Sequence, residues 1–221
     1  MEELFLNLRF SIKLTEALAC ITGFVFWKRL SPRCWKSFPV YLLVITLCEF
    51  AGWYMNNNGM SRQGKYMYSY FVVPLEFFFL FYMYLNMLPK VFRKTVFMLA
   101  GIFLLAFIAE YMLLLNTKWV WRSLTYVTGI VSVLILSIIY LLSLISRERV
   151  IQYKKEPFFW VNLGVLLFYV GSFPYFATLN YMYKANISLF WVLAFAMVVL
   201  NSMMYLFFTA GFICFRNRRS Y

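Results

Sequence analysis

The sequence predicts an all-α, polytopic membrane protein in which residues 1–221 form a single domain of seven transmembrane helices. Hydrophobic residues make up 64% of the 221-residue chain, charged residues make up only 13%, and the mean hydropathy is +0.74. Soluble domains average about 45–50% apolar and about 25% charged residues. A water-soluble chain of this length cannot bury so much apolar surface, so the bilayer must cover much of it.

Seven apolar stretches are long enough to cross a membrane. A helix needs about 20 apolar residues to cross a hydrocarbon core about 30 Å thick. The expected spans are residues 8–28, 37–55, 67–88, 95–115, 119–146, 158–180 and 188–214. Backbone groups in lipid must be satisfied internally, and no stretch alternates with a period of two, so each is predicted as a helix rather than a strand.

Each of the first three stretches carries a local signal at its start, at its end or within it. The first is expected to be a span and not a cleavable signal peptide, because Glu2, Glu3 and Arg9 precede it and no small-x-small cleavage site follows. The second ends at residues 56–59, Asn-Asn-Asn-Gly, which predict an outer turn. The third contains Pro74, which removes a backbone hydrogen bond and predicts a kink.

The last four stretches complete the alternation across the membrane. The fourth carries Glu110, and the fifth follows after the short segment that contains Lys118. The sixth contains Pro174, which predicts a second kink. The seventh contains Asn201 but no Lys, so the Schiff base that retinal needs in seven-helix rhodopsins is excluded.

The basic residues predict that the amino terminus is outside and the carboxyl terminus is cytoplasmic. Fourteen of the 21 Lys and Arg residues fall in the first, third and fifth loops and the tail, and seven fall on the opposite side. Short loops on the cytoplasmic side carry the excess of Lys and Arg. The net charge of +13 is therefore assigned to topology and to attraction for anionic headgroups, and no nucleic acid is expected as a partner.

The composition also excludes several kinds of chemistry. The chain has no His and no Asp, so imidazole metal sites, His-based triads and EF-hand loops are absent. The four Cys residues form no CxxC pair and are interpreted as thiols with no metal or disulfide role. No cofactor is expected. The longest loops have about ten residues, so a signal must leave through loops, the tail or a partner protein.

Four of the eight acidic residues lie inside predicted spans, and they give the main functional signal. At about 1.5 Å per residue, Glu16, Glu49, Glu76 and Glu110 lie about 12, 9, 13 and 8 Å from the outer ends of their helices. Intramembrane carboxylates usually face a bundle interior or a water-filled cavity. The shared level therefore predicts a polar pocket open to the outside. The predicted ligand-binding set is Glu16, Glu49, Glu76, Glu110, Arg122, Tyr175 and Asn201.

Structural explanations are open for several of these residues. Glu16 has Lys13 one turn away, and Glu110 has Lys118 or Arg122 near the start of the next helix, so ion pairing accounts for either carboxylate as well as a pocket does. Asn201 more often ties helices together by hydrogen bonds. Glu49 and Glu76 have no local base, which favours the pocket for them.

Three stretches carry a resemblance to a known family. They are residues 73–78 (Val-Pro-Leu-Glu-Phe-Phe), residues 156–169 from Glu-Pro-Phe-Phe-Trp to Phe-Tyr, and residues 200–211 from Leu-Asn to Gly. Across the whole chain the pattern resembles an uncharacterised family of bacterial seven-helix membrane proteins. That family is similar in layout to the seven-helix sensory modules of some histidine kinases. The resemblance implies the bacterial inner (plasma) membrane and a signalling partner that reads the basic loops.

Three classes of function fit these observations, in descending order. The first is a receptor or sensor subunit that binds a small ligand or lipid in the outer pocket and acts through a cytoplasmic or membrane partner. The second is a small-solute or cation/proton-coupled transporter in which Glu49 and Glu76 serve as ion sites. The third, an intramembrane lipid enzyme, ranks lowest because the chain lacks the His that usually shuttles protons.

Overall fold

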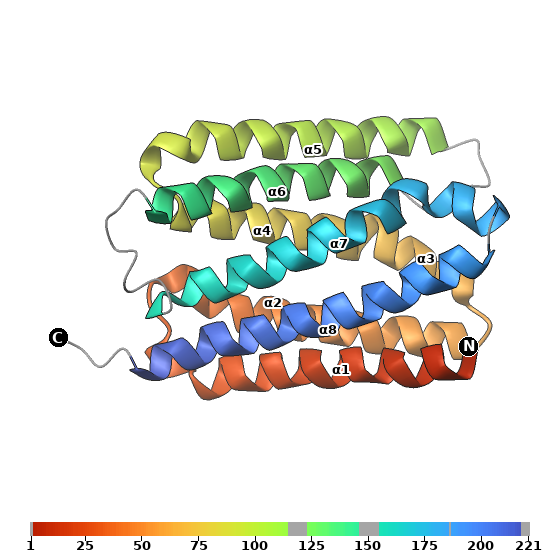
Figure 1. Ribbon diagram of the computed structural model, residues 1–221, viewed down its shortest axis with the longest axis horizontal. Helices are drawn as coiled ribbons and strands as arrows, with labels where there is room; N and C mark the ends of the chain where they lie inside the picture. The colour runs from red at the N-terminus through yellow and green to blue at the C-terminus, as the bar shows by residue number, and fades with distance from the viewer. Residues whose placement is uncertain (1, 115–122, 146–154, 186, 218–221) are drawn as a thin grey trace.

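The computed structural model describes residues 2–114, 123–145, 155–185 and 187–217, with side chains at residues 11–113, 124–145, 155–178 and 188–215. The described residues form a bundle of seven long helices and contain no strand. The helical bundle that the sequence predicts is therefore confirmed. Figure 1 shows the seven helices running roughly along one axis, so that successive loops lie at alternate ends of the bundle.

The helices occupy the predicted stretches, with shifted ends. They are α1 (Glu2–Val25), α2 (Arg33–Asn57), a third formed by α3 (Ser61–Met67), η2 (Tyr68–Val72) and α4 (Val73–Met87), then α5 (Arg93–Leu114), α6 (Ser123–Ile145), α7 (Pro157–Ala185) and α8 (Ile187–Asn217). Short helical turns, η1 (Trp27–Arg29) and η3 (Lys90–Phe92), complete two connections. Over the residues that the structure describes with side chains, six long helices from the second onward are apolar enough to cross a membrane, which makes the chain a multi-pass membrane protein.

Local sequence sets several of these boundaries. Gly59 adopts a φ of +73° and reverses the chain between α2 and α3, where the Asn-Asn-Asn-Gly turn was expected. The third helix begins six residues earlier than predicted, because residues 61–66 are polar but still helical. Pro157 occupies the first position of α7. An N–H at that position has no acceptor within the helix, so the N–H that proline lacks costs the helix no hydrogen bond.

The predicted kink at Pro74 takes the form of a π-helical turn. Residues 68–72 are π-helical and directly precede Val73 and Pro74. A proline ring clashes with the carbonyl of the residue four positions earlier, and a wider turn relieves that clash. Pro174 lies inside α7, and Figure 1 shows α7 bending in its second half.

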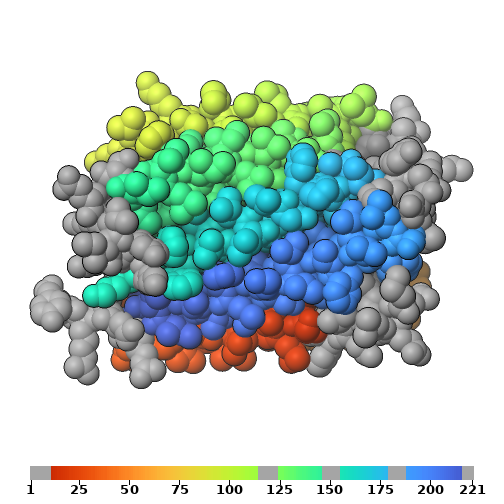
Figure 2. Space-filling view, viewed as in Figure 1, coloured from red at the N-terminus to blue at the C-terminus, as the bar shows by residue number. Residues whose placement is uncertain are grey.

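The helices form a ring around a central space. α1 packs on α2 and α8, α7 packs on α8 and α6, and α4 packs on α5 and α6. The α7–α8 contact is the most extensive of these. On the face drawn in Figure 2, α5, α6, α7 and α8 lie side by side with part of α1 beyond them.

Aromatic side chains fill the end of the bundle where the carboxyl terminus lies. Trp35 on α2 is buried and meets Phe215 edge to face at 4.8 Å between ring centres. It also meets Phe158 of α7 and Phe212 of α8 at 6.3 and 6.2 Å. We call these four rings the aromatic plug. Aromatic pairs of this kind add about 0.5–1.5 kcal/mol each beyond burial, so this end of the bundle is tightly closed.

Candidate functional site

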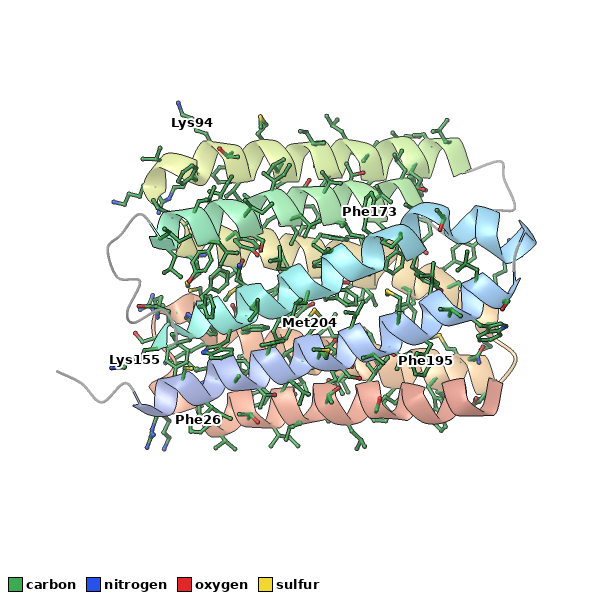
Figure 3. All side chains as sticks on the ribbon, viewed as in Figure 1. Phe26, Lys94, Lys155, Phe173, Phe195 and Met204 are labelled. Carbon is green, nitrogen blue, oxygen red and sulfur yellow. The ribbon has the colours of Figure 1, made fainter. Side chains whose placement is uncertain are left out.

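A cavity of about 190 Å³ lies among α2, η2, α4, α6, α7 and α8. Its polar lining consists of two carboxylates, one amide, one hydroxyl and four tyrosines: Glu49, Glu76, Asn201, Ser69, Tyr41, Tyr68, Tyr126 and Tyr205. Met204, labelled in Figure 3, belongs to its apolar lining and lies on α8 near the middle of the bundle. Three predicted site residues from separate helices, Glu49, Glu76 and Asn201, therefore meet at one cavity.

Glu76 enters the cavity from the first turn of α4, just after the π-helical turn. The hydroxyl of Tyr169 on α7 donates a hydrogen bond to Glu76 Oε1 at 2.6 Å. Tyr169 is fully buried, so this bond fixes the carboxylate against α7. Hydrogen bonds to charged groups are the stronger ones, and the second carboxylate oxygen is left for another partner.

Glu49 reaches the same cavity from α2 and is partly buried. No described residue forms a hydrogen bond or an ion pair with its carboxylate. Glu49 and Glu76 lie close enough to interact electrostatically. Two like charges near one apolar space repel each other, so the cavity favours a group that brings positive charge or protons.

Asn201 lies at the middle of α8 and lines the cavity with its side chain. Its Oδ1 atom is buried and accepts no hydrogen bond. An amide that tied two helices together would have such a bond, so the structure gives Asn201 no helix-tying role through this atom. A buried acceptor without a donor costs about 1–3 kcal/mol, which a bound donor would recover.

Aromatic rings close the cavity on two sides. On the side of the aromatic plug, Tyr41 stacks on Phe79 with ring centres 3.9 Å apart and planes 3° apart. On the α6 side, Tyr126 stacks on Phe176 at 3.8 Å. Towards the other end of α2, Tyr68 lies against Gly52, where a Cβ would sit 2.7 Å from its ring. Gly52 therefore makes room for the Tyr68 ring.

Glu16 lies outside the cavity lining, although the sequence groups it with Glu49 and Glu76. It is 1% exposed on α1, and neither carboxylate oxygen has a hydrogen-bond partner. The predicted pairing with Lys13 does not form, because Lys13 Nζ lies over the Trp53 ring at 5.0 Å from its centre. Glu16 and Glu49 interact electrostatically, so Glu16 lies close behind the cavity wall.

Among the described residues, the partner of Glu110 is the start of α6, whereas Lys118 and Arg122, the expected bases, lie outside them. Its two carboxylate oxygens accept the backbone N–H groups of Leu124 and Thr125 at 3.1 and 2.8 Å, at the start of α6. A carboxylate at a helix N-terminus satisfies orphan donors and complements the helix dipole. Glu110 therefore caps α6 from α5 and does not line the cavity.

The remaining predicted site residues lie elsewhere. Tyr175 packs against Phe176 and Phe190 with ring centres 5.2 and 5.9 Å apart, and it does not line the cavity. Arg122 lies outside the described residues, as does Lys118. Whether Tyr175 or Arg122 contacts a ligand stays a prediction.

The predicted ligand-binding set does not include Tyr169, Tyr205 or Ser69, although helical spacing contains a signal for the last two. Residues three, four, seven or eight positions apart share a helix face. On α8, Tyr205 follows Asn201 by four residues, and in the third helix Ser69 precedes Glu76 by seven. Tyr169 has no such marker, because its bond to Glu76 crosses between helices.

Among the described residues, no group of three or more His, Cys, Asp or Glu is placed to hold a metal ion. No protein-family model, curated protein or solved structure matches the chain. The fold and the cavity thus define a multi-pass helical membrane protein with an acidic, tyrosine-lined internal site.

Proposed function

We propose that this protein is a membrane receptor or sensor subunit that binds a small ligand in the cavity between α2, α4, α6, α7 and α8. One observation carries the proposal: two carboxylates and an unsatisfied amide converge from three helices on a space large enough for a small molecule. Polar groups placed inside a bilayer are costly, so their convergence indicates a site rather than packing. The connections between the helices are too short to hold a catalytic domain, which supports a partner protein as the route of the signal.

The proposed orientation places the amino terminus outside and the aromatic plug near the cytoplasm. The connections at the plug end hold exposed basic residues, including Arg29 and Arg33 between α1 and α2. Figure 3 shows Lys94 and Lys155 at that same end, where the chain approaches its carboxyl terminus. The positive-inside rule supports a cytoplasmic location for this end, and the ligand then enters from the outer side.

The proposed signal is a shift of the helices that line the cavity. The π-helical turn at residues 68–72 and Pro174 interrupt regular backbone hydrogen bonding in two of those helices. Such interruptions are the positions at which helices bend. A ligand that contacts Glu76 and Asn201 would move α4 and α8, and the basic connections beyond the plug would present the change to a partner.

Partner capture tests the receptor proposal. The tagged chain is crosslinked in native membranes, and a double variant with Arg33→Glu and Lys36→Glu removes charge from the plug end. A matched double variant with Arg62→Glu and Lys65→Glu removes charge from the opposite end. We expect a discrete partner that the first variant loses and the second keeps. Recovery of the isolated protein alone would contradict the proposal.

A carrier is the second candidate function, and Glu49 favours it. Its carboxylate has no partner among the described residues, so it is available to exchange a proton or cation. Proteoliposome flux separates the two proposals. A carrier shows uptake that Glu49→Gln and Glu76→Gln abolish, whereas a receptor binds without net transport.

A further inference from the structure

The charge of the cavity lining indicates the chemical class of ligand that the proposed receptor binds. This inference rests on the proposed function. Among the residues whose side chains the structure describes, Glu49 and Glu76 line the space and no Lys or Arg does. Glu16 lies behind the wall and interacts electrostatically with Glu49. An anionic ligand would meet repulsion with no compensating base, and a neutral ligand would leave the carboxylates without a counter-charge.

The walls of the cavity suit an organic cation better than a bare metal ion. Tyr41, Tyr126 and Tyr205 present aromatic rings to the space, and Met197 and Met204 add apolar surface. Ammonium groups are attracted to aromatic faces, with about 0.5–2 kcal/mol per contact. A small hard cation requires six or more oxygen ligands at short distance, and the described residues place no three carboxylates or thiolates together.

The unsatisfied acceptors indicate a cation that carries N–H groups. Among the described residues, Asn201 Oδ1 is buried without a donor, Glu49 has no hydrogen-bond or ion-pair partner, and Tyr169 donates to only one oxygen of Glu76. A primary ammonium has three N–H groups, one for each of these acceptors, and a secondary ammonium has two. A quaternary ammonium has no N–H and would leave Asn201 unsatisfied.

The volume limits the size of the ligand. An engineered cavity of about 150 Å³ holds benzene. A cavity of about 190 Å³ therefore accommodates one ring, or an equivalent short chain, together with an amino group. We propose that the cavity binds a small protonated primary or secondary amine, with Glu49, Glu76 and Asn201 as hydrogen-bond acceptors and the tyrosine rings around the apolar part.

An ammonium group of this kind has two sources in a membrane, a free amine or the headgroup of phosphatidylethanolamine. The full chain is reconstituted in nanodiscs of phosphatidylcholine and phosphatidylglycerol, and binding of phenethylamine is measured by calorimetry. The neutral isostere phenethyl alcohol and the anionic analogue hydrocinnamate are measured in parallel. A second set of nanodiscs contains phosphatidylethanolamine. Weaker phenethylamine binding there identifies the lipid headgroup as the ligand, and unchanged binding identifies a free amine.

The expected result is saturable binding of phenethylamine, with the alcohol and the carboxylate at least about tenfold weaker. Glu49→Gln, Glu76→Gln and Asn201→Leu should each weaken amine binding by about 10- to 100-fold, because the Gln variants remove a negative charge that faces the ammonium and Asn201→Leu removes a hydrogen-bond acceptor. Glu156→Gln, which changes a glutamate outside the cavity lining, should have no effect. The unfolding temperature of each variant without ligand shows that it is folded.

Three results would overturn the ammonium assignment: no binding of phenethylamine to the wild type, equal binding of the alcohol or the carboxylate, or cavity variants that bind as tightly as the wild type. None of these results would contradict the receptor proposal, because partner capture tests the receptor role separately. Loss of the partner with retained amine selectivity would instead remove the receptor role and leave the site.

Discussion

Replacing the buried carboxylate of Glu16 should stabilise the protein. Glu16 is 1% exposed, and its two carboxylate oxygens have no hydrogen-bond partner. Thr46 on α2 is near it, but the Thr46 hydroxyl donates to the Leu42 carbonyl oxygen at 2.8 Å. A buried polar group without a partner costs about 1–3 kcal/mol in proteins. Methionine is unbranched like glutamate and close to it in volume, and such swaps cost under about 1.5 kcal/mol.

We therefore expect Glu16→Met to raise the free energy of unfolding by about 1–2 kcal/mol. The measurement is equilibrium unfolding in mixed micelles, followed by tryptophan fluorescence. Glu16→Gln keeps an unsatisfied polar group and should change stability little. Glu49→Met is the matched control, and because Glu49 is only partly buried its gain should be smaller. A loss of more than about 1 kcal/mol in Glu16→Met, with Glu16→Gln unchanged, would refute this reasoning, because it would mean that Glu16 has a partner.

Three further substitutions test other contacts. Glu110→Ala should lower the free energy of unfolding by about 1–2 kcal/mol, because it removes the cap that satisfies two backbone N–H groups of α6. Gly164→Ala should cost about 1–3 kcal/mol, since its Cβ would lie 3.1 Å from a backbone carbonyl oxygen of α8, whereas Gly101→Ala meets open space and should be neutral or slightly stabilising. Tyr169→Phe should cost about 0.5–1.5 kcal/mol by removing the hydrogen bond to Glu76.

Each of these predictions has its own contrary outcome, measured by the same unfolding assay. Wild-type stability in Glu110→Ala would mean that solvent or a neighbouring side chain caps α6 equally well. Equal effects at Gly164 and Gly101 would show that close approach does not limit the α7–α8 contact. An unchanged Tyr169→Phe would mean that the hydroxyl contributes no net stability and that Glu76 relies on another group.

Hydropathy and charge predicted the helices well because both are local properties of the chain. A helix in lipid satisfies its own backbone, so an apolar stretch of sufficient length identifies it without knowledge of its neighbours. The start of the third helix shifted by six residues, because residues 61–66 are polar yet continue the helix outside the apolar window. The kink at Pro74 was predicted but its π-helical form was not, because a bent α-helix and a π-helical turn both relieve the clash of a proline ring.

The four intramembrane glutamates show where local reasoning ends. A shared depth placed Glu16, Glu49, Glu76 and Glu110 at one level, but depth does not fix the direction in which a side chain points. Rotation about each helix axis is set by packing, and it directs Glu49 and Glu76 to the cavity. It directs Glu110 to the start of α6, and it leaves Glu16 buried between helices.

The most direct test of an outward-facing site is the reactivity of a cysteine placed at Asn201. In a background whose four native cysteines are replaced by serine, Asn201→Cys is exposed to a membrane-impermeant cationic thiol reagent on either side of the membrane. Leu206→Cys, on the exposed surface of α8, is the lipid-facing control, and Val91→Cys reports the opposite end. The account predicts that Asn201→Cys reacts from the outside and that phenethylamine protects it, at a higher concentration than the wild type needs because the substitution removes one acceptor. An Asn201→Cys that stays unreactive, or that reacts only from the cytoplasmic side, would contradict it.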